Sequence, residues 1–452
     1  MKVQKLIITV IISLASLLTA FSQLQKATPF QVGAAKIDIT PDENNLPKGF
    51  FRIQDNLFCR AIVINNGTTS AALIAVDQGM VRNDSYDKIT QRIESELGIP
   101  SLNIYICPSH THSAPWGTGP ELEDAVFESV KQAKEKLQPA VLSYETGLSY
   151  ININRDVIDL ETRLWKQGPN YEGTSDKTVA VIKFADTSGN PIAVFYNFAM
   201  HANTMFMSGA ISADFPGVTS KYIEDYYDDK LIAIFSSGAA GDQNPISVNP
   251  MTDVASQKTN ALLASGKAKE LGEAIMMAGM GGESDVKIDE KALVRQAQMI
   301  TSLGQLLGEE VLRVMTLPQR TDSVMQIYSS QQMITCPGRK RTNTGREGAP
   351  GTYVDGDPVK IKLSLLRLGD IAIAGVNAEV YNIIAQRLKK ESPLTNTIFS
   401  SITNGASNSG YIPSDDAFQR YTFQVLSSNL QPNYAERGII DGLVKMIEES
   451  DL

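Results

Sequence analysis

Short apolar runs of strand length alternate with segments of helical apolar spacing along nearly the whole sequence, and this alternation constrains the fold more than any other feature. The pattern contains no internal repeat, and no stretch rich in proline and serine marks a domain boundary. Turn residues at 186–190 and 368–370 predict two hairpins, so some neighbouring strands are antiparallel. We therefore expect a single catalytic domain of α/β class, in which mixed sheets are flanked by helices.

The individual elements follow from the same pattern. Strands are predicted at residues 57–64, 71–76, 102–107, 178–184, 192–197, 231–235, 360–366 and 371–376. Helices are predicted at residues 86–97, 121–137, 218–227, 291–314, 378–389 and 435–449. Residues 336–351 combine turn residues with several basic ones, and we expect them to be irregular.

The first 22 residues have the pattern of a secretory signal peptide. Lys2 and Lys5 precede an apolar stretch at residues 6–20, and Ala20-Phe21-Ser22 has the small-x-small form of a cleavage site. This stretch is short for a membrane span, which needs roughly 20 residues, and no later run reaches that length. We expect residues 1–22 to be removed and residues 23–452 to be exported, to the periplasm or beyond, without a transmembrane segment.

Charge and cysteine content limit which partners the chain can bind and how many disulfide bonds it can form. The formal net charge is −9, so nucleic acid is a poor partner, and 42% hydrophobic with 20% charged residues is ordinary for a globular protein. The cysteines Cys59, Cys107 and Cys336 are too few for a disulfide framework and lack C-x-x-C spacing. At most one bridge can form among them, and the sequence does not decide whether any pair does.

The chain has only three histidines, and each follows a predicted strand. His110 and His112 come after the strand at 102–107, and His201 comes after the strand at 192–197. Two more predicted strands end in polar residues, at the loop 236–245 and at Glu379. Because ligands of open α/β sheets bind beyond the carboxyl ends of the strands, we expect these residues to form one site.

Imidazole nitrogen and carboxylate oxygen are ligands that zinc prefers, and a catalytic zinc keeps a position open for water. The bound water then has a pKa near ~7 and supplies hydroxide at neutral pH. A lone His-x-His is a weak signal, and a histidine at a strand end is often an ordinary surface or hydrogen-bonded residue. From the residues alone, both a metal site and a structural role stay open.

Residues 109–115, Ser-His-Thr-His-Ser-Ala-Pro, resemble the T-H-T-H-S-G-P motif of the neutral (non-lysosomal) ceramidases, zinc-dependent amidases that split N-acylsphingosine into a fatty acid and sphingosine. Other segments resemble that family in the same order along the chain, from about residue 34 to the C-terminus. They are residues 34–41, 197–201 followed by 211–214, 369–379 and 410–413.

The resemblance implies a zinc ion held by His110, His201, Glu379 and Tyr411, with His112 beside the metal as a proton donor or a transition-state hydrogen bonder. Tyr411 is also expected to stabilise the developing oxyanion, and Asp214 to contact substrate. Ordinary roles remain open for these residues. Glu379 can complement the dipole of a helix that begins there, and Tyr411 can be a half-buried aromatic residue. Asp77 and Asp242 are typical turn residues, and each either accepts hydrogen bonds in a turn or cap or lies at the metal.

The sequence departs from the family pattern in two places. The family's G-D-x-S-P loop corresponds to Gly241-Asp242-Gln243-Asn244-Pro245, so Asn244 stands where a serine was considered a nucleophile. Asparagine forms no acyl-enzyme, whereas its amide can donate a hydrogen bond to an oxyanion. The family's C-terminal immunoglobulin-like domain would begin where this chain stops, and we expect the catalytic module alone.

The basic residues of the 336–351 segment bear on the substrate. Arginine suits carboxylate or phosphate, so Arg339 and Arg341, with Lys340 and Arg346 nearby, are candidates for binding a polar or anionic group. We expect an exported zinc-dependent hydrolase of neutral-ceramidase type that cleaves an amide (N-acyl) or related acyl bond of a small-molecule or lipid-like substrate by zinc-activated water. The alternatives are an esterase or lactonase acting on a polar or anionic carbohydrate-derived substrate, and a zinc-containing binding protein without turnover. The substrate, the scissile bond and the oligomeric state stay open.

Overall fold

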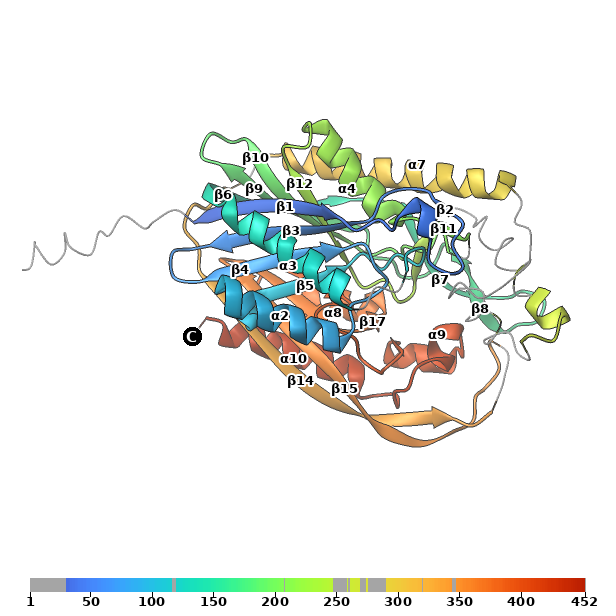
Figure 1. Cartoon of the computed structure of the whole chain (residues 1–452). Helices are drawn as coiled ribbons and strands as arrows, with labels where there is room; N and C mark the ends of the chain where they lie inside the picture. The colour runs from blue at the N-terminus through green and yellow to red at the C-terminus, as the bar shows by residue number, and fades with distance from the viewer. Residues whose placement is uncertain are drawn as a thin grey trace, which may run out of the picture.

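The chain folds into three α/β layers around a shared apolar core, which confirms the predicted fold class (Figure 1). The computed structural model describes residues 30–115, 119–206, 208–246, 258, 261–268, 274, 290–318, 320–343 and 347–451. The predicted signal peptide at residues 1–22 lies outside the described residues. Every predicted strand and helix overlaps an observed one, and both predicted hairpins are present, between β9 and β10 and between β15 and β16.

The largest sheet has eight strands in the order β12-β10-β9-β6-β1-β3-β4-β5. Pairing of Gln31 with Pro139 and of Val32 with Gln138 joins β1 to β6, so the sheet consists of two four-stranded halves. Within these halves β4 and β5 are parallel, as are β10 and β12, and the other pairs are antiparallel. The strands are β1 (Gln31–Asp38), β3 (Phe58–Asn65), β4 (Ser70–Val76), β5 (Ile104–Pro108), β6 (Gln138–Leu148), β9 (Thr178–Asp186), β10 (Pro191–Phe198) and β12 (Ile232–Ser237).

The second sheet has four strands in the order β14-β15-β16-β18. Residues 336–341, predicted to be irregular, instead continue β14 and pair with β15. A bulge between Cys336 and Gly338 accommodates Pro337 without ending the strand. The strands of this sheet are β14 (Ile327–Arg341), β15 (Tyr353–Leu368), β16 (Ile371–Val376) and β18 (Asn396–Ser401). Smaller sheets contain β2 (Arg52–Ile53) with β11 (Ala210–Ile211), β13 (Gln243–Pro245) with β7 (Asn152–Ile158) and β8 (Trp165–Asn170), and β17 (Glu379–Val380) with β19 (Tyr411–Ile412).

Pairs of amphipathic helices cover the outer faces of the sheets. One pair packs on the β1-β3-β4-β5 half, a second on the β12-β10-β9-β6 half and a third on the four-stranded sheet (Figure 1). The inner faces of all three share one core, to which Ile62, Phe195 and Ile373 belong. The pairs are α2 (Asn83–Leu97) with α3 (Pro120–Glu135), α4 (Asp214–Tyr226) with α7 (Glu290–Met315), and α8 (Asn382–Glu391) with α10 (Ala435–Glu449); α9 (Phe423–Leu426) is a single turn.

Two predicted helix starts are wrong by four residues, those of α4 and α8, and the second matters for the site. The apolar spacing predicted a helix from residue 378, but α8 begins at Asn382. Two contacts explain the later start. The Asp242 carboxylate accepts a hydrogen bond from the Asn382 backbone N–H at 2.8 Å, as a helix cap does. Before it, Glu379 pairs with Tyr411 as part of β17. Glu379 therefore lies in a strand, and the proposal that it complements a helix dipole is wrong.

Within the part of the chain that the structure describes, no helix combines the length and the apolar character that crossing a membrane requires.

A buried ion cluster holds α4 against the first half of the large sheet. Arg60 on β3 donates to Glu224 on α4 at 2.8 Å and to Asp77 at 3.1 Å, and Lys36 on β1 donates to Glu224 at 2.8 Å. The side chains of Arg60 and Glu224 are 3% and 1% exposed. The charges of Arg60 and Glu224 are therefore compensated by their protein partners rather than by water.

We predict that Glu224→Ala lowers the free energy of unfolding by about 3–5 kcal/mol, because it leaves the buried Arg60 guanidinium short of a counter-charge. The matched control is Asp225→Ala, which removes an exposed pair with Lys221 and should change stability by less than about 1 kcal/mol. Denaturant unfolding of both variants measures the difference. Equal losses in the two variants would contradict this role for Glu224.

Candidate active site

His110 follows β5 and His201 follows β10, and the two side chains point their Nε2 atoms toward each other. Nδ1 of His110 lies 2.7 Å from the Gly79 carbonyl oxygen, and Nδ1 of His201 lies 2.9 Å from the Ala240 carbonyl oxygen. A carbonyl oxygen only accepts, so each Nδ1 carries a proton, and Nε2 is the ring nitrogen of each histidine that faces the other. Backbone carbonyls that orient histidines in this way are a regular feature of metal sites.

The Nε2 atoms meet a carboxylate oxygen. Nε2 of His110 and Nε2 of His201 are 3.1 Å apart, and Oε2 of Glu379 is 3.3 Å from each of them. Nε2 of His112 is 3.3 Å from Nε2 of His110. The ligand atoms of the three histidines all lie within 4.8 Å of one another. The structure therefore brings together His110, His112, His201 and Glu379, which come from three separate segments of the sequence.

This geometry fits a cation. Burial, together with the nearby Arg155, lowers the pKa of His201 well below its ordinary value, so its Nε2 stays unprotonated. The Nε2 atoms of His110 and His201 are only 3.1 Å apart, and Oε2 of Glu379, 3.3 Å from each of them, is buried without a hydrogen-bond partner. A metal ion among these atoms would satisfy all of them, and two imidazoles with a carboxylate form a donor set that suits zinc.

Tyr411 completes one side of the cluster. It is 8% exposed, lies beside Glu379 in the parallel pair of β17 and β19, and stacks its ring 6.5 Å from the His201 ring. Its hydroxyl interacts with the side chains of Glu379 and Arg155, and burial and the Glu379 charge raise the pKa of Tyr411 above its ordinary value. The structure thus places Tyr411 next to the predicted ligands, and its role as a ligand stays a prediction.

His112 faces the same point from a more open position. Its backbone N–H donates to the Ala202 carbonyl at 3.0 Å, and the edge of its half-buried ring packs against Phe206 with 5.2 Å between ring centroids. Burial and the neighbouring His110 lower the pKa of His112 to about 3, so the ring is neutral at pH 7. Its predicted place beside the metal is compatible with this position.

Sequence reasoning missed Arg155, a buried residue of β7 that is 2% exposed. Its guanidinium donates to the Gly241 carbonyl at 2.5 and 3.1 Å and to Oδ1 of Asn244 at 3.2 Å, and it lies 5.4 Å from the centroid of the Tyr411 ring. Arg155 follows Ile151 and Ile153 at a spacing of two residues, but Asn152, Asn154 and Asp156 are buried as well, so this spacing does not single it out.

Asn244 is linked to Arg155, and one end of its amide is already used. Its Oδ1 accepts hydrogen bonds from Arg155 and from Nδ2 of Asn203, both at 3.2 Å. These two contacts do not use the Nδ2 group of Asn244, and its role as a donor to a bound oxygen stays a prediction. The contacts of Arg155 set the direction of that donor.

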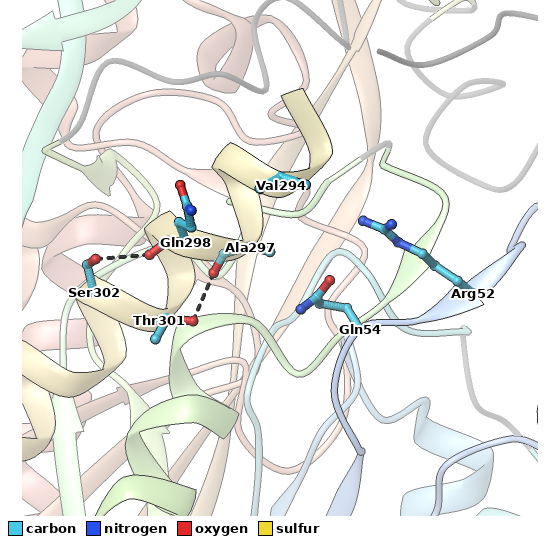
Figure 2. Close-up of a pocket in the computed structure, with 7 residues that line it drawn as sticks. All are labelled: Arg52, Gln54, Val294, Ala297, Gln298, Thr301 and Ser302. Atoms are coloured by element: carbon cyan, nitrogen blue, oxygen red, sulfur yellow. Dashed lines mark hydrogen bonds between the residues drawn. The ribbon is translucent and has the colours of Figure 1, made fainter. Parts of the chain in front are cut away.

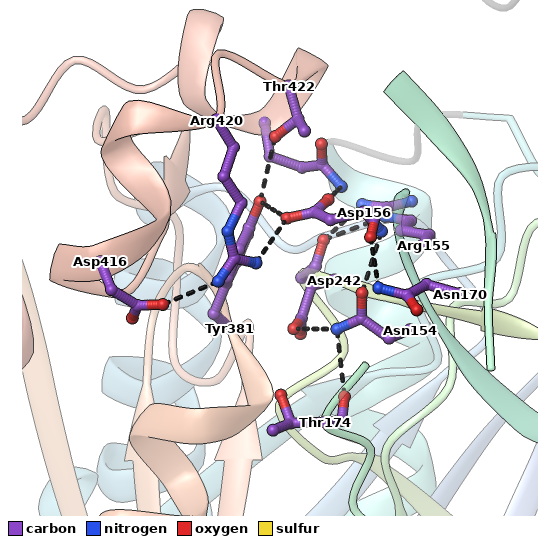
Figure 3. A network of polar contacts seen from close by, with 12 residues as sticks. Asn154, Arg155, Asp156, Asn170, Thr174, Asp242, Tyr381, Asp416, Arg420 and Thr422 are labelled. Carbon is purple, nitrogen blue, oxygen red and sulfur yellow. Dashed lines mark hydrogen bonds and ion pairs between the residues drawn. The ribbon is translucent and has the colours of Figure 1, made fainter. Parts of the chain in front are cut away.

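Asp77 and Asp242 hold backbone in place, which confirms their interpretation as turn and cap residues. Asp77 pairs with Arg60 and accepts from the Phe58 backbone N–H at 2.9 Å. Asp242 caps α8 and accepts from Nδ2 of Asn154 at 2.9 Å, within the network drawn in Figure 3. Burial and the nearby Asp156 raise the pKa of Asp242 to about 7.

The residues predicted to bind substrate make hydrogen bonds to groups other than the histidines. Asp214 is fully buried and accepts from the backbone N–H groups of Met205 and Phe215 at 2.9 and 2.7 Å. Arg339 donates to the carbonyls of Val425 and Ser428 at 2.6 and 3.2 Å. Nε of Arg341 donates to Asn343, and Lys340 is exposed. Arg346 lies outside the described residues. The assignment of Asp214, Arg339 and Arg341 to substrate binding stays a prediction.

An open groove of about 620 Å³ lies elsewhere on the surface, between β2 and α7. Arg52 and Gln54 face α7 across it (Figure 2). Its described lining residues are Arg52, Gln54, Val294, Ala297, Gln298, Thr301 and Ser302, none of which belongs to the histidine cluster.

Fold and site together define a mixed α/β protein with a buried centre of imidazole and carboxylate donors at the strand ends. A family model described as neutral/alkaline non-lysosomal ceramidase, N-terminal, matches residues 120–357, which is more than half of the chain. The chain belongs to this family, and the resemblance found in the sequence is confirmed.

Relatives and solved structures agree with this assignment. Neutral ceramidases of Drosophila pseudoobscura pseudoobscura and Drosophila melanogaster are each 23% identical, over 355 and 299 residues, which cover 70% and 55% of this chain. The alignments span 48% and 42% of those proteins, less than half of either length. A ceramidase complexed with C2 has the same fold, with a TM-score of 0.69 and 16% identity over 94% of this chain and 76% of that one. The neutral ceramidase from Pseudomonas aeruginosa also has a TM-score of 0.69 and 16% identity, over 93% of this chain and 75% of its own.

We predict that His110→Ala and His201→Ala lose bound zinc during purification, because each removes a buried ligand atom from a small donor set. His112→Ala should keep it, since His112 is assigned a place beside the metal. Elemental analysis of the purified variants, with circular dichroism as a check of folding, measures the outcome. A full equivalent of zinc in both His110→Ala and His201→Ala would show that the ligands lie elsewhere.

Proposed function

We propose that the chain is an exported zinc-dependent hydrolase of neutral-ceramidase type that cleaves the amide bond of an N-acylated, lipid-like substrate. The observation that carries this proposal is the convergence of two buried Nε2 atoms and a buried carboxylate oxygen without a hydrogen-bond partner, at the ends of strands from two sheets. Membership of the family and relatives named as neutral ceramidases support the reaction type. The signal-like segment at residues 1–22 supports export.

Zinc would be held by His110, His201, Glu379 and Tyr411. When bound, it supplies a Lewis acid and lowers the pKa of a bound water to ~7, so that a nucleophile is available at neutral pH. No serine nucleophile is needed, which is consistent with asparagine at position 244.

The surrounding side chains then orient the substrate and move protons. Nδ2 of Asn244 and the hydroxyl of Tyr411 donate hydrogen bonds to the carbonyl oxygen as it gains negative charge. Arg155 holds both donors in position, because it contacts Asn244 directly and Tyr411 through its ring and hydroxyl. The proton that the attacking water loses goes to the amide nitrogen as the C–N bond breaks, and the neutral ring of His112 acts beside this transfer as a transition-state hydrogen bonder. The products are a carboxylate and an amine.

Two aromatic rings border the cluster and favour an apolar substrate. Phe206 packs on His112, and the half-exposed Phe423 packs on Tyr411 with 5.8 Å between ring centroids. Such rings exclude water and match an acyl chain. Arg339, in contrast, donates to backbone carbonyls and packs 3.9 Å from the Tyr353 ring centroid, so its contacts do not favour an anionic carbohydrate-derived substrate. A measurement of substrate turnover distinguishes this enzyme from a zinc-containing binding protein without activity.

We predict that the zinc-loaded protein releases fatty acid from a fluorescent N-acylsphingosine, that chelation abolishes this activity and that added zinc restores it. The same treatment of His201→Ala should restore nothing, because a ligand is missing. An unchanged rate after complete removal of zinc would contradict the metal-dependent mechanism. Full zinc occupancy without turnover of any acyl substrate would instead support the binding protein.

We predict that Asn244→Ala lowers kcat by about 10- to 1,000-fold, the range for loss of one oxyanion donor. Asn244→Asp is the matched variant, because it keeps the oxygen that Arg155 and Asn203 contact but lacks the donor, and it should be slowed similarly. Asn244→Ser should show no burst of acyl-enzyme in pre-steady-state kinetics. A wild-type rate in Asn244→Ala and Asn244→Asp, at equal zinc content, would remove this residue from the mechanism.

A further inference from the structure

The histidines and Glu379 follow strands of two different sheets, and among the described residues no backbone pairing between strands joins these two sheets. His110 follows β5 and His201 follows β10, in different halves of the eight-stranded sheet, while Glu379 follows β16 of the four-stranded sheet. A metal centre needs its donor atoms placed to within about 0.5 Å. The spacing between the histidines and Glu379 therefore depends on the contacts that join the two sheets near the site.

Asn404 makes such a contact with β5. Its backbone N–H donates to the Ile106 carbonyl at 3.1 Å, and its Oδ1 accepts from the Ile106 N–H at 2.8 Å, so one residue pairs with the edge of β5 as a strand would. Its Nδ2 donates to Ser364 on β15 at 3.1 Å. The residue is 1% exposed, with a left-handed φ of 61°, a conformation that asparagine tolerates better than most residues.

The chain around Asn404 continues to Glu379. The preceding Thr403 N–H donates to the Val376 carbonyl at 3.0 Å, and the Ile402 N–H donates to the Ala378 carbonyl at 3.1 Å. These carbonyls belong to the residues just before Glu379. A short series of hydrogen bonds thus runs from β5, four residues before His110, to the residue beside Glu379.

Asn197 makes the corresponding contact for β10. Its Nδ2 donates to the Phe399 carbonyl on β18 and to Ser236 Oγ on β12, both at 3.0 Å. It is 4% exposed and lies four residues before His201. Ser236 Oγ is in turn 2.8 Å from Ser400 Oγ, so the polar contact extends along β18. Because β18 pairs with β16, which leads to Glu379, this amide links the His201 strand to the Glu379 strand.

We propose that Asn197 and Asn404 are positioning residues that fix the distance between the histidines and Glu379 across the junction of the two sheets. The inference rests on the metal centre of the proposed function, and it assigns these residues an effect on metal affinity that exceeds their effect on stability. They act through the ligands and contact neither metal nor substrate.

The chain offers a matched control at the opposite end of β5. Asn103 precedes β5 and also bridges the same two sheets, since its Nδ2 donates to the Ser70 carbonyl at 2.8 Å and its Oδ1 accepts from Ser329 on β14 at 2.5 Å. Asn103→Ala removes comparable hydrogen bonds far along the strand from His110. This variant measures how weaker contacts between the two sheets affect zinc binding when Asn197 and Asn404 are unchanged.

The experiment measures zinc dissociation constants by chelator competition and the visible spectrum of the cobalt-substituted protein. Asn197→Ala and Asn404→Gly, which keeps the left-handed backbone, should bind zinc about 10- to 100-fold more weakly and change the cobalt bands. Asn404→Asp keeps the acceptor for Ile106 and should lie closer to wild type. Asn103→Ala should retain wild-type affinity and spectrum, even though denaturant unfolding of its zinc-free form shows a loss of stability.

Two results would overturn the inference. Wild-type affinity and spectrum in both Asn197→Ala and Asn404→Gly would show that the ligands hold their spacing without these amides. Weaker zinc binding in Asn103→Ala, in proportion to its lost stability, would show a general loosening of the fold. Failure of the wild-type protein to bind zinc or cobalt would be a different result, because it would overturn the metal centre itself together with this inference.

Discussion

The structure depends on an arrangement that a cation would stabilise: two buried imidazole Nε2 atoms face each other 3.1 Å apart beside a carboxylate oxygen that has no hydrogen-bond partner. Burying polar atoms without partners costs free energy. Backbone carbonyls of Gly79 and Ala240 nevertheless force this orientation on His110 and His201. The fold is therefore built to keep donor atoms together in advance of a ligand.

Polar contacts outside the cluster also help to hold the donor atoms in place. Asp242 fixes the start of α8 and thereby leaves Glu379 in a strand beside Tyr411. Arg155 connects the loop that holds Asn244 to the Tyr411 ring. These buried charges are satisfied by several partners, as interior polar networks must be. The expected hydrolytic chemistry thus has a rigid polar surrounding, while Phe206 and Phe423 leave the approach apolar.

Much of this was predictable from local sequence, because strands buried on both faces read as apolar runs and amphipathic helices show a 3.6-residue period. The strand-end positions of the three histidines were correctly predicted, and the family resemblance selected Glu379 and Tyr411, which the structure places beside them. The errors arise where distant contacts decide the local structure. Glu379 becomes strand by pairing with Tyr411, and residues 336–341 become strand by pairing with β15. Arg155 was missed because its neighbours come from β13 and β19, far along the chain.

Anomalous diffraction at the zinc edge, from crystals of the protein grown with zinc, tests the central claim most directly. The account predicts one strong peak among Nε2 of His110, Nε2 of His201 and Oε2 of Glu379. A map without a peak at that point, or with its only strong peak elsewhere on the molecule, would contradict it.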